Sequence, residues 1–281
     1  MTEVRLEIGY DEYEDGMRME QLIEQLAAKP ESREVVELTI GSWGQAYEEG
    51  PDTFMDVLIG HKDAFPALRK LFIGDMDSEE CEISWIMQTN LAPLLEAFPQ
   101  LTSFCIQGST GLFLKPLKHG RLEELVIICG GLSKEVLADI RDAELPELRK
   151  LELYLGVDNY GFDGGLEDVK PLMEPGRFPK LTYLGLKDSE IQDEIAIEIA
   201  NSPILDQLHT LDLSLGTLSD QGAEALLASE RVRKLSFLDL NYHYMSDKMV
   251  RRWQTSGMSV DVSDQQQSDD DDDWRYPAVT E

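Results

Sequence analysis

A pattern of apolar-x-x-apolar-x-apolar recurs eight times along the chain and is its clearest regular feature. The later positions of each copy alternate between apolar and polar residues, which is the period of a β-strand with one buried face. Successive copies are 21 to 33 residues apart, so each strand is followed by room for a turn or a helix. The copies begin at Val35, Leu68, Leu101, Leu122, Leu148, Leu181, Leu208 and Leu235.

The last three copies share a strict period of 27 residues that extends beyond the strand. A fixed period of about 20–29 residues on this strand pattern is typical of leucine-rich repeats, each a strand followed by a helix or turn. The sequence therefore predicts an α/β leucine-rich-repeat solenoid, a horseshoe of about 8–10 repeats, with a parallel sheet on the concave face and helices on the convex face. The aligned residues are Leu181, Leu208 and Leu235; Ile191, Leu218 and Met245; Asp193, Asp220 and Asp247; and Ile199, Leu226 and Trp253.

Three segments are predicted along the chain. Residues 1–34 form an N-terminal cap, with a strand at Val4–Ile8 and a helix at Met17–Ala28 that covers the open end of the core. Residues 35–262 form the solenoid and end in a short strand at Ser259–Val262. Residues 263–281 form an acidic C-terminal tail, which either hangs free or docks on the last repeat through Trp274 and Tyr276.

Apolar periodicity also predicts the helices between the strands. The aligned Ser219 and Ser246, with the acidic residue after each, suit helix N-termini, because a hydroxyl accepts from unpaired amides and a carboxylate favours the positive end of the helix dipole. We assign these residues a structural role. The predicted helices are Thr53–Ile59, Trp85–Ala97, Lys134–Asp142, Leu166–Met173, Asp193–Asn201, Asp220–Ala228 and Asp247–Thr255.

The third, fifth and seventh positions of each copy face the concave surface, since successive side chains of a strand point to opposite faces. These positions are unusually apolar and aromatic near the middle of the chain, and exposed aromatic residues on a sheet face are typical of an interface. Alternatively, the insertions at 41–51, 75–84 and 156–165 fold over this face and bury it. The candidate partner-binding residues are Phe72, Cys105, Val126, Ile128, Lys150, Glu152, Tyr154, Tyr183, Lys187, Asp212, Phe237 and Asp239.

The net charge of −30 and the isoelectric point of about 4.3 restrict the kinds of partner. Such a surface repels nucleic acids and anionic lipids and attracts proteins with basic patches; the alternative is that the acidity only maintains solubility. The first residues lack the pattern of a signal peptide and there is no long apolar run, so we expect no membrane span. Three cysteines without C-x-x-C spacing favour a reducing compartment, and we expect a cytoplasmic monomer.

Motifs for catalysis, metals and cofactors are weak. The acidic loop Asp75–Glu82 has Glu80 where a calcium-binding EF-hand loop needs glycine, and the glycine-rich loop Gly156–Gly165 lacks the features of a phosphate-binding loop. The run Asp269–Asp273 could attract divalent cations weakly. We therefore expect no enzyme activity, no metal and no cofactor. The alternatives are an enzyme or metal-dependent module that uses the carboxylates of these two loops, or a secreted effector.

The stretch Leu208–Ser229 resembles the ribonuclease-inhibitor class of leucine-rich repeats, through Leu-x-x-Leu-Asp-Leu-Ser-x-Gly-x-Leu-Ser-Asp-x-Gly-Ala-x-x-Leu. That class has Asn or Cys at position nine, where it bonds neighbouring turns. This chain departs from the class there, so inhibition of a ribonuclease does not carry over and the turns must be held differently. The residues at position nine are Trp43, Met76, Ser109, Gly130, Gly156, Ser189, Gly216 and His243.

The whole chain also resembles an uncharacterised family of bacterial cytoplasmic leucine-rich-repeat proteins. The similarity lies in Glu79–Ile86, in Asp193–Ala196 with Ser202 and Pro203, and in Arg275 with Tyr276. Neighbouring genes of that family encode radical-SAM-type enzymes and a sulfatase-like hydrolase. The resemblance implies an adaptor or substrate-presenting role and transfers no active site. Together these observations predict a non-catalytic protein-interaction scaffold.

Overall fold

Parallel β-strands form where the sequence repeats its apolar pattern. The computed structural model describes residues 2–267 and 274–280. In this part of the chain each predicted repeat contains a strand, and the strands lie in two compact units. The division of the chain into cap, solenoid and tail stays a prediction.

The first unit comprises Met1–Cys129 and Asp142–Leu148. Its strands pair in parallel and in chain order: β1 (Thr2–Ile8), β2 (Val35–Trp43), β3 (Lys70–Ile73), β4 (Ser103–Gln107) and β5 (Glu124–Ile128). The α-helices are α1 (Tyr10–Glu14), α2 (Met19–Ala27), α3 (Asp52–Gly60) and α4 (Ala92–Ala97). Short 3-10 helices are η1 (Pro30–Glu34), η2 (Lys62–Ala64) and η3 (Ile83–Trp85).

The second unit comprises Gly130–Arg141 and Arg149–Thr280. Its strands also pair in parallel and in chain order: β6 (Lys150–Gly156), β7 (Tyr183–Ser189), β8 (Thr210–Asp212), β9 (Phe237–Asp239) and β10 (Val260–Asp261). The α-helices are α5 (Lys134–Arg141), α6 (Leu166–Val169), α7 (Gln192–Ile199), α8 (Asp220–Ala228) and α9 (Asp247–Gln254). The 3-10 helices are η4 (Asp158–Tyr160), η5 (Lys170–Met173), η6 (Pro203–Asp206) and η7 (Val232–Lys234).

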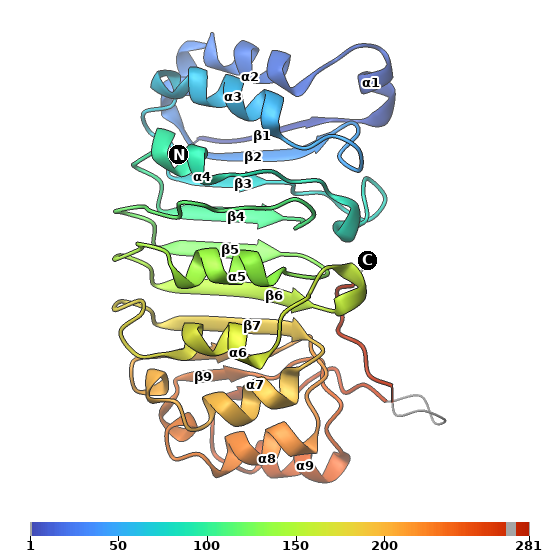
Figure 1. The fold of residues 1–281 in the computed structure, drawn as a ribbon, viewed down its shortest axis with the longest axis vertical. Helices are drawn as coiled ribbons and strands as arrows, with labels where there is room; N and C mark the ends of the chain where they lie inside the picture. The colour runs from blue at the N-terminus through green and yellow to red at the C-terminus, as the bar shows by residue number, and fades with distance from the viewer. Residues whose placement is uncertain (1, 268–273, 281) are drawn as a thin grey trace. The chain divides into compact units, whose positions relative to one another are not determined.

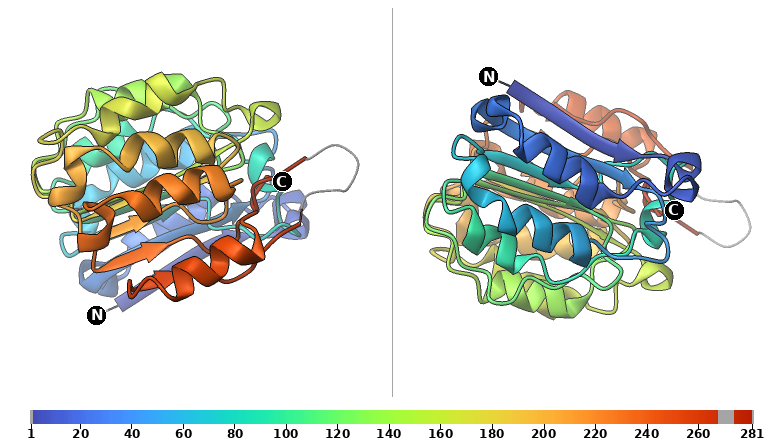
Figure 2. Two further views of the ribbon diagram at one scale, coloured as in Figure 1. Left: turned by 90° about the horizontal axis from the view of Figure 1, so that it is seen from below. Right: turned by 90° about the horizontal axis from the view of Figure 1, so that it is seen from above.

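Helices cover one face of the sheet in each unit. Figure 1 shows α2, α3 and α4 in front of the strands of the first unit, and α5, α6 and α7 in front of those of the second. Within each unit, the two views of Figure 2 also show the helices on one side of the strands. In the part of the chain that the structure describes, no helix covers the opposite face, which is called the helix-free face below.

Leucines at the first, fourth and sixth repeat positions fill the core between sheet and helices. In β7, Leu184 and Leu186 have no exposed surface, and Leu211 and Leu213 repeat this arrangement one strand later. Burying one such side chain stabilises the fold by about 1.5–3 kcal/mol. The predicted inward positions are therefore confirmed.

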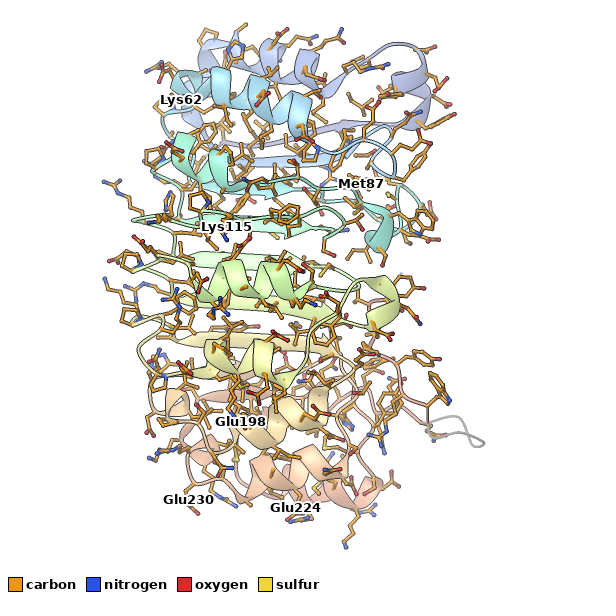
Figure 3. All side chains as sticks on the ribbon, viewed as in Figure 1. Lys62, Met87, Lys115, Glu198, Glu224 and Glu230 are labelled. Atoms are coloured by element: carbon orange, nitrogen blue, oxygen red, sulfur yellow. The ribbon has the colours of Figure 1, made fainter. Side chains whose placement is uncertain are left out.

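Charged side chains of the helices reach neighbouring helices instead of the core. Glu198 and Glu224 are labelled in Figure 3, and each meets a cation of an adjacent element. Lys170 Nζ lies 3.2 Å from a carboxylate oxygen of Glu198, and Arg252 Nη2 donates to Glu224 over 2.9 Å. No helix among residues 2–267 and 274–280 has the length and apolarity to cross a membrane.

The prediction of one helix over Trp85–Ala97 is wrong in its first half. The structure has only the short η3 and then, from Ala92, α4. Between them the chain is held extended, because Met87 N donates to Ala46 O over 2.8 Å and Gln88 N to Thr110 O over 2.7 Å. Tertiary pairing with neighbouring loops overrides the apolar pattern in this segment.

Aspartates at helix starts connect successive repeats. Asp193 Oδ1 accepts from the amides of Ser219 (2.8 Å) and Gly222 (3.0 Å), at the start of the next helix, α8. One repeat later, Asp220 accepts from the amide and hydroxyl of Ser246, both over 2.7 Å. The serines also cap their helices, as predicted. The aspartates therefore act between repeats, and we call this arrangement the aspartate ladder.

His243 stands at position nine of the last repeat, where the ribonuclease-inhibitor class has Asn or Cys. Its side chain is fully buried. Nδ1 accepts from Met245 N over 3.1 Å, and Nε2 lies 3.1 Å from Val262 O in the next turn. Burial lowers the pKa of His243, so a neutral ring with its proton on Nε2 suits both bonds.

The C-terminal segment lies on the second unit. Ala278 N donates to Leu215 O over 2.8 Å, and Pro277 is buried. Trp274 and Tyr276 stack on each other at 5.7 Å between ring centroids, with 58% and 51% of their surface exposed. The segment is thus held by polar bonds and Pro277, while both aromatic rings stay mostly in solvent. The run Asp269–Asp273 lies outside the described residues.

We expect Asp193→Ala to lower the free energy of unfolding by about 2 kcal/mol, because charge-assisted bonds to the start of α8 are lost. The matched control is Asp247→Ala. Asp247 is exposed and accepts from Gln265 Nε2 over 3.1 Å, so its loss should cost less than about 0.5 kcal/mol. Urea denaturation measures both. Equal losses for the two variants would show that the ladder does not stabilise the fold.

Candidate functional site

In-register pairing turns the repeat positions into rows on the helix-free face. In the first unit Phe72 lies opposite Cys105, and Cys105 lies opposite Val126. Ile128 lies opposite Gln107 in the next row. The first four candidate residues from the sequence are therefore neighbours on one sheet face.

These residues remain partly open to solvent. Phe72, Cys105 and Ile128 are half-buried, and Val126 is 8% exposed. Strand β4 alternates regularly between half-buried and buried residues, as expected of a sheet with one solvated face. Three of the four residues therefore keep part of their surface exposed, and the first unit presents an apolar strip.

The second unit carries a polar counterpart on its helix-free face. We call it the sheet-face cluster, and all six of its members are candidates from the sequence. Strands β6, β7 and β8 place them in adjacent rows. The members are Lys150, Glu152, Tyr154, Tyr183, Lys187 and Asp212.

Lys187 is the centre of the sheet-face cluster. Its Nζ lies 3.0 Å from Asp212 Oδ2 and 3.4 Å from Glu152 Oε1. The side chains of Lys187 and Glu152 are each 11% exposed, and that of Asp212 is 4% exposed. Lys150 Nζ adds a second cation 2.9 Å from Glu152 Oε2. Two carboxylates thus share two ammonium groups in a poorly solvated place.

Hydroxyl and amide groups also donate hydrogen bonds to the Asp212 carboxylate. Tyr183 donates its hydroxyl to Asp212 Oδ2 over 2.6 Å. Ser214, directly beyond β8, donates both its amide (3.0 Å) and its hydroxyl (2.6 Å) to Asp212 Oδ1. Gly185 makes the close packing possible, because an added Cβ would lie 3.1 Å from Glu152 Cγ and 3.3 Å from a Tyr183 ring carbon.

The cluster keeps its charges despite burial. Burial by itself lowers the pKa of Lys187, but the charges of Asp212 and Glu152 outweigh it, and the pKa is raised. Burial likewise raises the pKa of Asp212, yet the Lys187 charge and the bonds from Ser214 and Tyr183 bring it below its usual range. Burial, and then the charge of Asp212, raise the pKa of Tyr183. At neutral pH the ion pairs are intact and the tyrosine is neutral.

The two tyrosine rings of the cluster cover the lysines. Lys187 Nζ lies 5.0 Å from the ring centroid of Tyr154, and Lys150 Nζ lies 5.0 Å from that of Tyr183. Both rings are half-buried. Such cation–π contacts stabilise by about 0.5–2 kcal/mol each. The rings therefore form the solvent-facing part of a cluster whose charged atoms lie beneath them.

Phe237 and Asp239 extend this surface onto β9. Phe237 lies opposite Thr210, and Asp239 lies between Asp212 of β8 and Asp261 of β10. Burial raises the pKa of Asp239, and the charges of Asp212 and Asp261 add to this shift. Among residues 2–267 and 274–280 no ion pair joins a cation to Asp239 or Asp261. The outer end of the row is therefore acidic and uncompensated.

Two of the loop carboxylates that would serve an enzyme or a metal site already have bonding partners. In the acidic loop, Asp77 Oδ1 accepts from the amides of Glu79 and Glu80, both over 3.0 Å. In the glycine-rich loop, Asp163 Oδ2 lies 3.1 Å from Lys134 Nζ. The described part of the chain contains no group of three or more His, Cys, Asp or Glu side chains arranged to hold a metal ion.

Asp188 is a buried carboxyl that sequence reasoning missed. It has no exposed surface, and Oδ1 accepts from Val279 N over 2.8 Å. Burial raises its pKa to about 7, although bonds from the amides of Val279 and Ala278 and the charge of Lys187 act in the opposite direction. The 27-residue register aligns Asp188 with Leu215 and Tyr242, but these three side chains share no chemistry that would draw attention to the position.

Comparison with solved structures shows an extensive similarity. The chain is similar to a Bacteroides fragilis protein whose crystal structure was solved by the Northeast Structural Genomics Consortium, with 37% sequence identity and a TM-score of 0.89. The match covers 99% of this chain and 77% of that one. No protein-family model and no curated protein matches the chain.

An internalin from Listeria monocytogenes is a distant structural neighbour. It has 12% sequence identity and a TM-score of 0.41, over 85% of this chain and 71% of the internalin. A likeness this weak supports no conclusion about fold or function.

We expect Lys187→Met to lower the free energy of unfolding by about 3–5 kcal/mol, because it leaves two buried carboxylates without their shared cation. Lys70→Met is the control, since Lys70 is 55% exposed in its 3.1 Å pair with Glu37 and should cost less than about 1 kcal/mol. Urea denaturation at neutral pH compares them. A similar small loss in both variants would contradict the assigned role of Lys187.

The raised pKa of Asp188 predicts a pH-dependent stability. The folded chain holds this proton up to about pH 7, whereas the unfolded chain releases it near the ordinary pKa of about 3.9. The contribution of this proton is therefore complete only below about pH 3.9 and is lost progressively as the pH rises from there to about 7. Asn imitates the protonated carboxyl. We expect Asp188→Asn to match the wild type near pH 3 and to exceed it by about 3–4 kcal/mol at pH 8, because the folded and unfolded pKa values differ by about 3 units. Urea denaturation at both pH values measures this, and identical pH profiles for the two proteins would refute it.

Proposed function

We propose a non-catalytic binding function for this chain, which belongs to the same family as the Bacteroides fragilis protein. On this proposal the chain is a leucine-rich-repeat solenoid of the ribonuclease-inhibitor-like class, and it binds a protein partner on its helix-free face. Family membership itself transfers a fold and no activity.

The proposal is supported mainly by the partial exposure of apolar side chains on the helix-free face. Aromatic and apolar side chains stand partly exposed on it, and in the described residues no helix covers them. Phe72 in the first unit and Phe237 in the second are the clearest examples, since both aromatic side chains are half-buried. Aromatic side chains in such positions dominate the energetics of protein interfaces.

The charges of the second unit favour a basic partner. Lys187 neutralises Glu152 and Asp212, but Asp239 and Asp261 have no such cation within the described residues. A lysine or arginine of a partner would complete this row as Lys187 completes its inner end. Charge complementarity of this kind acts mainly on the rate of association and on specificity.

The buried ion pairs belong to the scaffold and do not reach the partner directly. Glu152 and Asp212 form ion pairs with Lys187. We infer that their role is to hold the rings of Tyr154 and Tyr183 in position. Tyr154, Tyr183 and Phe237 then offer rigid aromatic surface that loses little conformational entropy on binding.

The test is a comparative capture experiment with purified protein as bait. We expect Phe72→Ala and Phe237→Ala each to reduce the amount of partner recovered from native cells, quantified by mass spectrometry, by about tenfold. Phe113→Ala is the control, because Phe113 is 49% exposed but lies in the loop after β4, where its backbone pairs with Asn90 and Leu91 just before α4. Asp239→Asn should slow association and weaken its dependence on salt.

Thermal melting of the three phenylalanine variants accompanies the experiment. Reduced capture counts for the proposal only where the variant melts within a few degrees of the wild type. If the folded Phe72→Ala and Phe237→Ala proteins capture the same proteins as Phe113→Ala in equal amounts, the helix-free face is not the binding surface.

A further inference from the structure

The C-terminal segment crosses three successive turns of the second unit in reverse order. Tyr276 bonds to the turn after β9, Ala278 to the turn after β8, and Val279 to the end of β7. Figure 1 shows this red segment at the carboxyl ends of the strands, running towards the end of the chain. The segment is extended and meets one repeat after another, as a bound peptide would.

The turns beneath it share an uncommon backbone conformation. Asp188, Leu215 and Tyr242 have φ angles of 54°, 66° and 56°, in the left-handed region that residues other than glycine rarely adopt. Backbone strain of this kind costs about 1–3 kcal/mol per residue and gathers at functional sites. At Leu215 this conformation serves the C-terminal segment, because the Leu215 carbonyl oxygen accepts a hydrogen bond from Ala278 N.

Polar side chains complete the surface under the segment. Tyr244 donates its hydroxyl to Tyr276 O and accepts from Tyr276 N, both over 3.0 Å. Arg275 lies 3.3 Å from Asp193 Oδ2, which is an ion pair between partly buried side chains. We call Asp188, Asp193, Leu215, Tyr242 and Tyr244 the turn ledge.

One carboxyl oxygen of the turn ledge has no hydrogen-bond partner. Asp188 Oδ2 is buried and has no hydrogen-bond partner, while Oδ1 of the same carboxyl is satisfied by Val279 N. A buried polar atom without a partner costs about 1–3 kcal/mol. The chain's own C-terminal segment therefore leaves one hydrogen-bonding atom of this surface unused.

The segment is also held in a way that allows exchange. Its two aromatic rings are more than half exposed, and its bonds go to a few carbonyl, hydroxyl and carboxylate groups. Polar bonds of this type are exchanged for water at little net cost, since each contributes about 0.5–1.5 kcal/mol.

We propose that the turn ledge is a recognition site for an extended peptide segment of another protein, and that residues Arg275–Thr280 occupy it as an intramolecular competitor. The ligand carries an arginine for Asp193, then an aromatic residue and a proline, and a further hydrogen-bonding group that reaches Asp188 Oδ2. This surface lies at the strand ends and is distinct from the helix-free face, so the inference goes beyond the binding function proposed above. Recognition rests on main-chain hydrogen bonds, with side chains adding specificity.

The test uses the full chain and a fluorescein-labelled peptide with the sequence of residues 274–280. The wild type should bind this peptide weakly, because its own segment competes at a high effective concentration. Arg275→Glu removes the ion pair of the competitor and leaves Asp193 free for the arginine of the peptide. We expect Arg275→Glu to bind the peptide at least about tenfold more tightly than the wild type in fluorescence anisotropy.

Two controls show whether the peptide occupies the turn ledge. Adding Tyr244→Phe to Arg275→Glu removes a hydroxyl that makes two bonds and should weaken binding by about tenfold, whereas adding Tyr10→Phe, an exposed tyrosine of the first unit, should leave it unchanged. In hydrogen exchange, saturating peptide should expose the amides of Ala278 and Val279 in the wild type. Absence of peptide binding to Arg275→Glu, equal binding with Tyr244→Phe, or unchanged protection of these two amides would each overturn the proposal.

Discussion

Parallel pairing of the strands in register is the constraint on which both units depend. Because each strand meets its neighbour at the same repeat position, every position becomes a row that runs across the sheet. The leucines become a continuous core, and the alternate positions become a surface. Beyond the strands the same register places Asp193 beside Ser219 and Asp220 beside Ser246, so a local helix cap becomes a connection between repeats.

Rows of like residues create an electrostatic difficulty for so acidic a chain. Carboxylates on adjacent strands lie close together, and their repulsion is costly where water is excluded. The second unit solves this with Lys187 between Glu152 and Asp212, and leaves Asp239 and Asp261 without a cation in the described residues. The same row is therefore a structural element at one end and a surface available to a basic partner at the other.

The C-terminal segment contacts the second unit at the turns that follow its strands. It uses groups that the repeat leaves unsatisfied, namely the carbonyl of a left-handed residue and the carboxyl of Asp188. A repeat architecture satisfies its backbone bonds between neighbouring strands, so unused bonding groups gather at the turns. Such groups are the natural places for a peptide, whether it comes from the chain's own terminus or from another protein.

The sequence alone determined the strands and most of the helices, because their apolar periods are set by burial and recur at fixed spacing. It also assigned the face on which Phe72, Tyr183 and Phe237 lie, since alternation follows from strand geometry. It failed at Trp85–Ala97, where apolar periodicity does not reveal that Met87 and Gln88 bond to distant loops. Only the tertiary structure decided that Lys187 sits between two carboxylates, and that Asp188 is buried beneath Val279. The reason is physical: a pattern along the chain records which side is buried, whereas pairing between polar groups depends on atoms that only folding brings together.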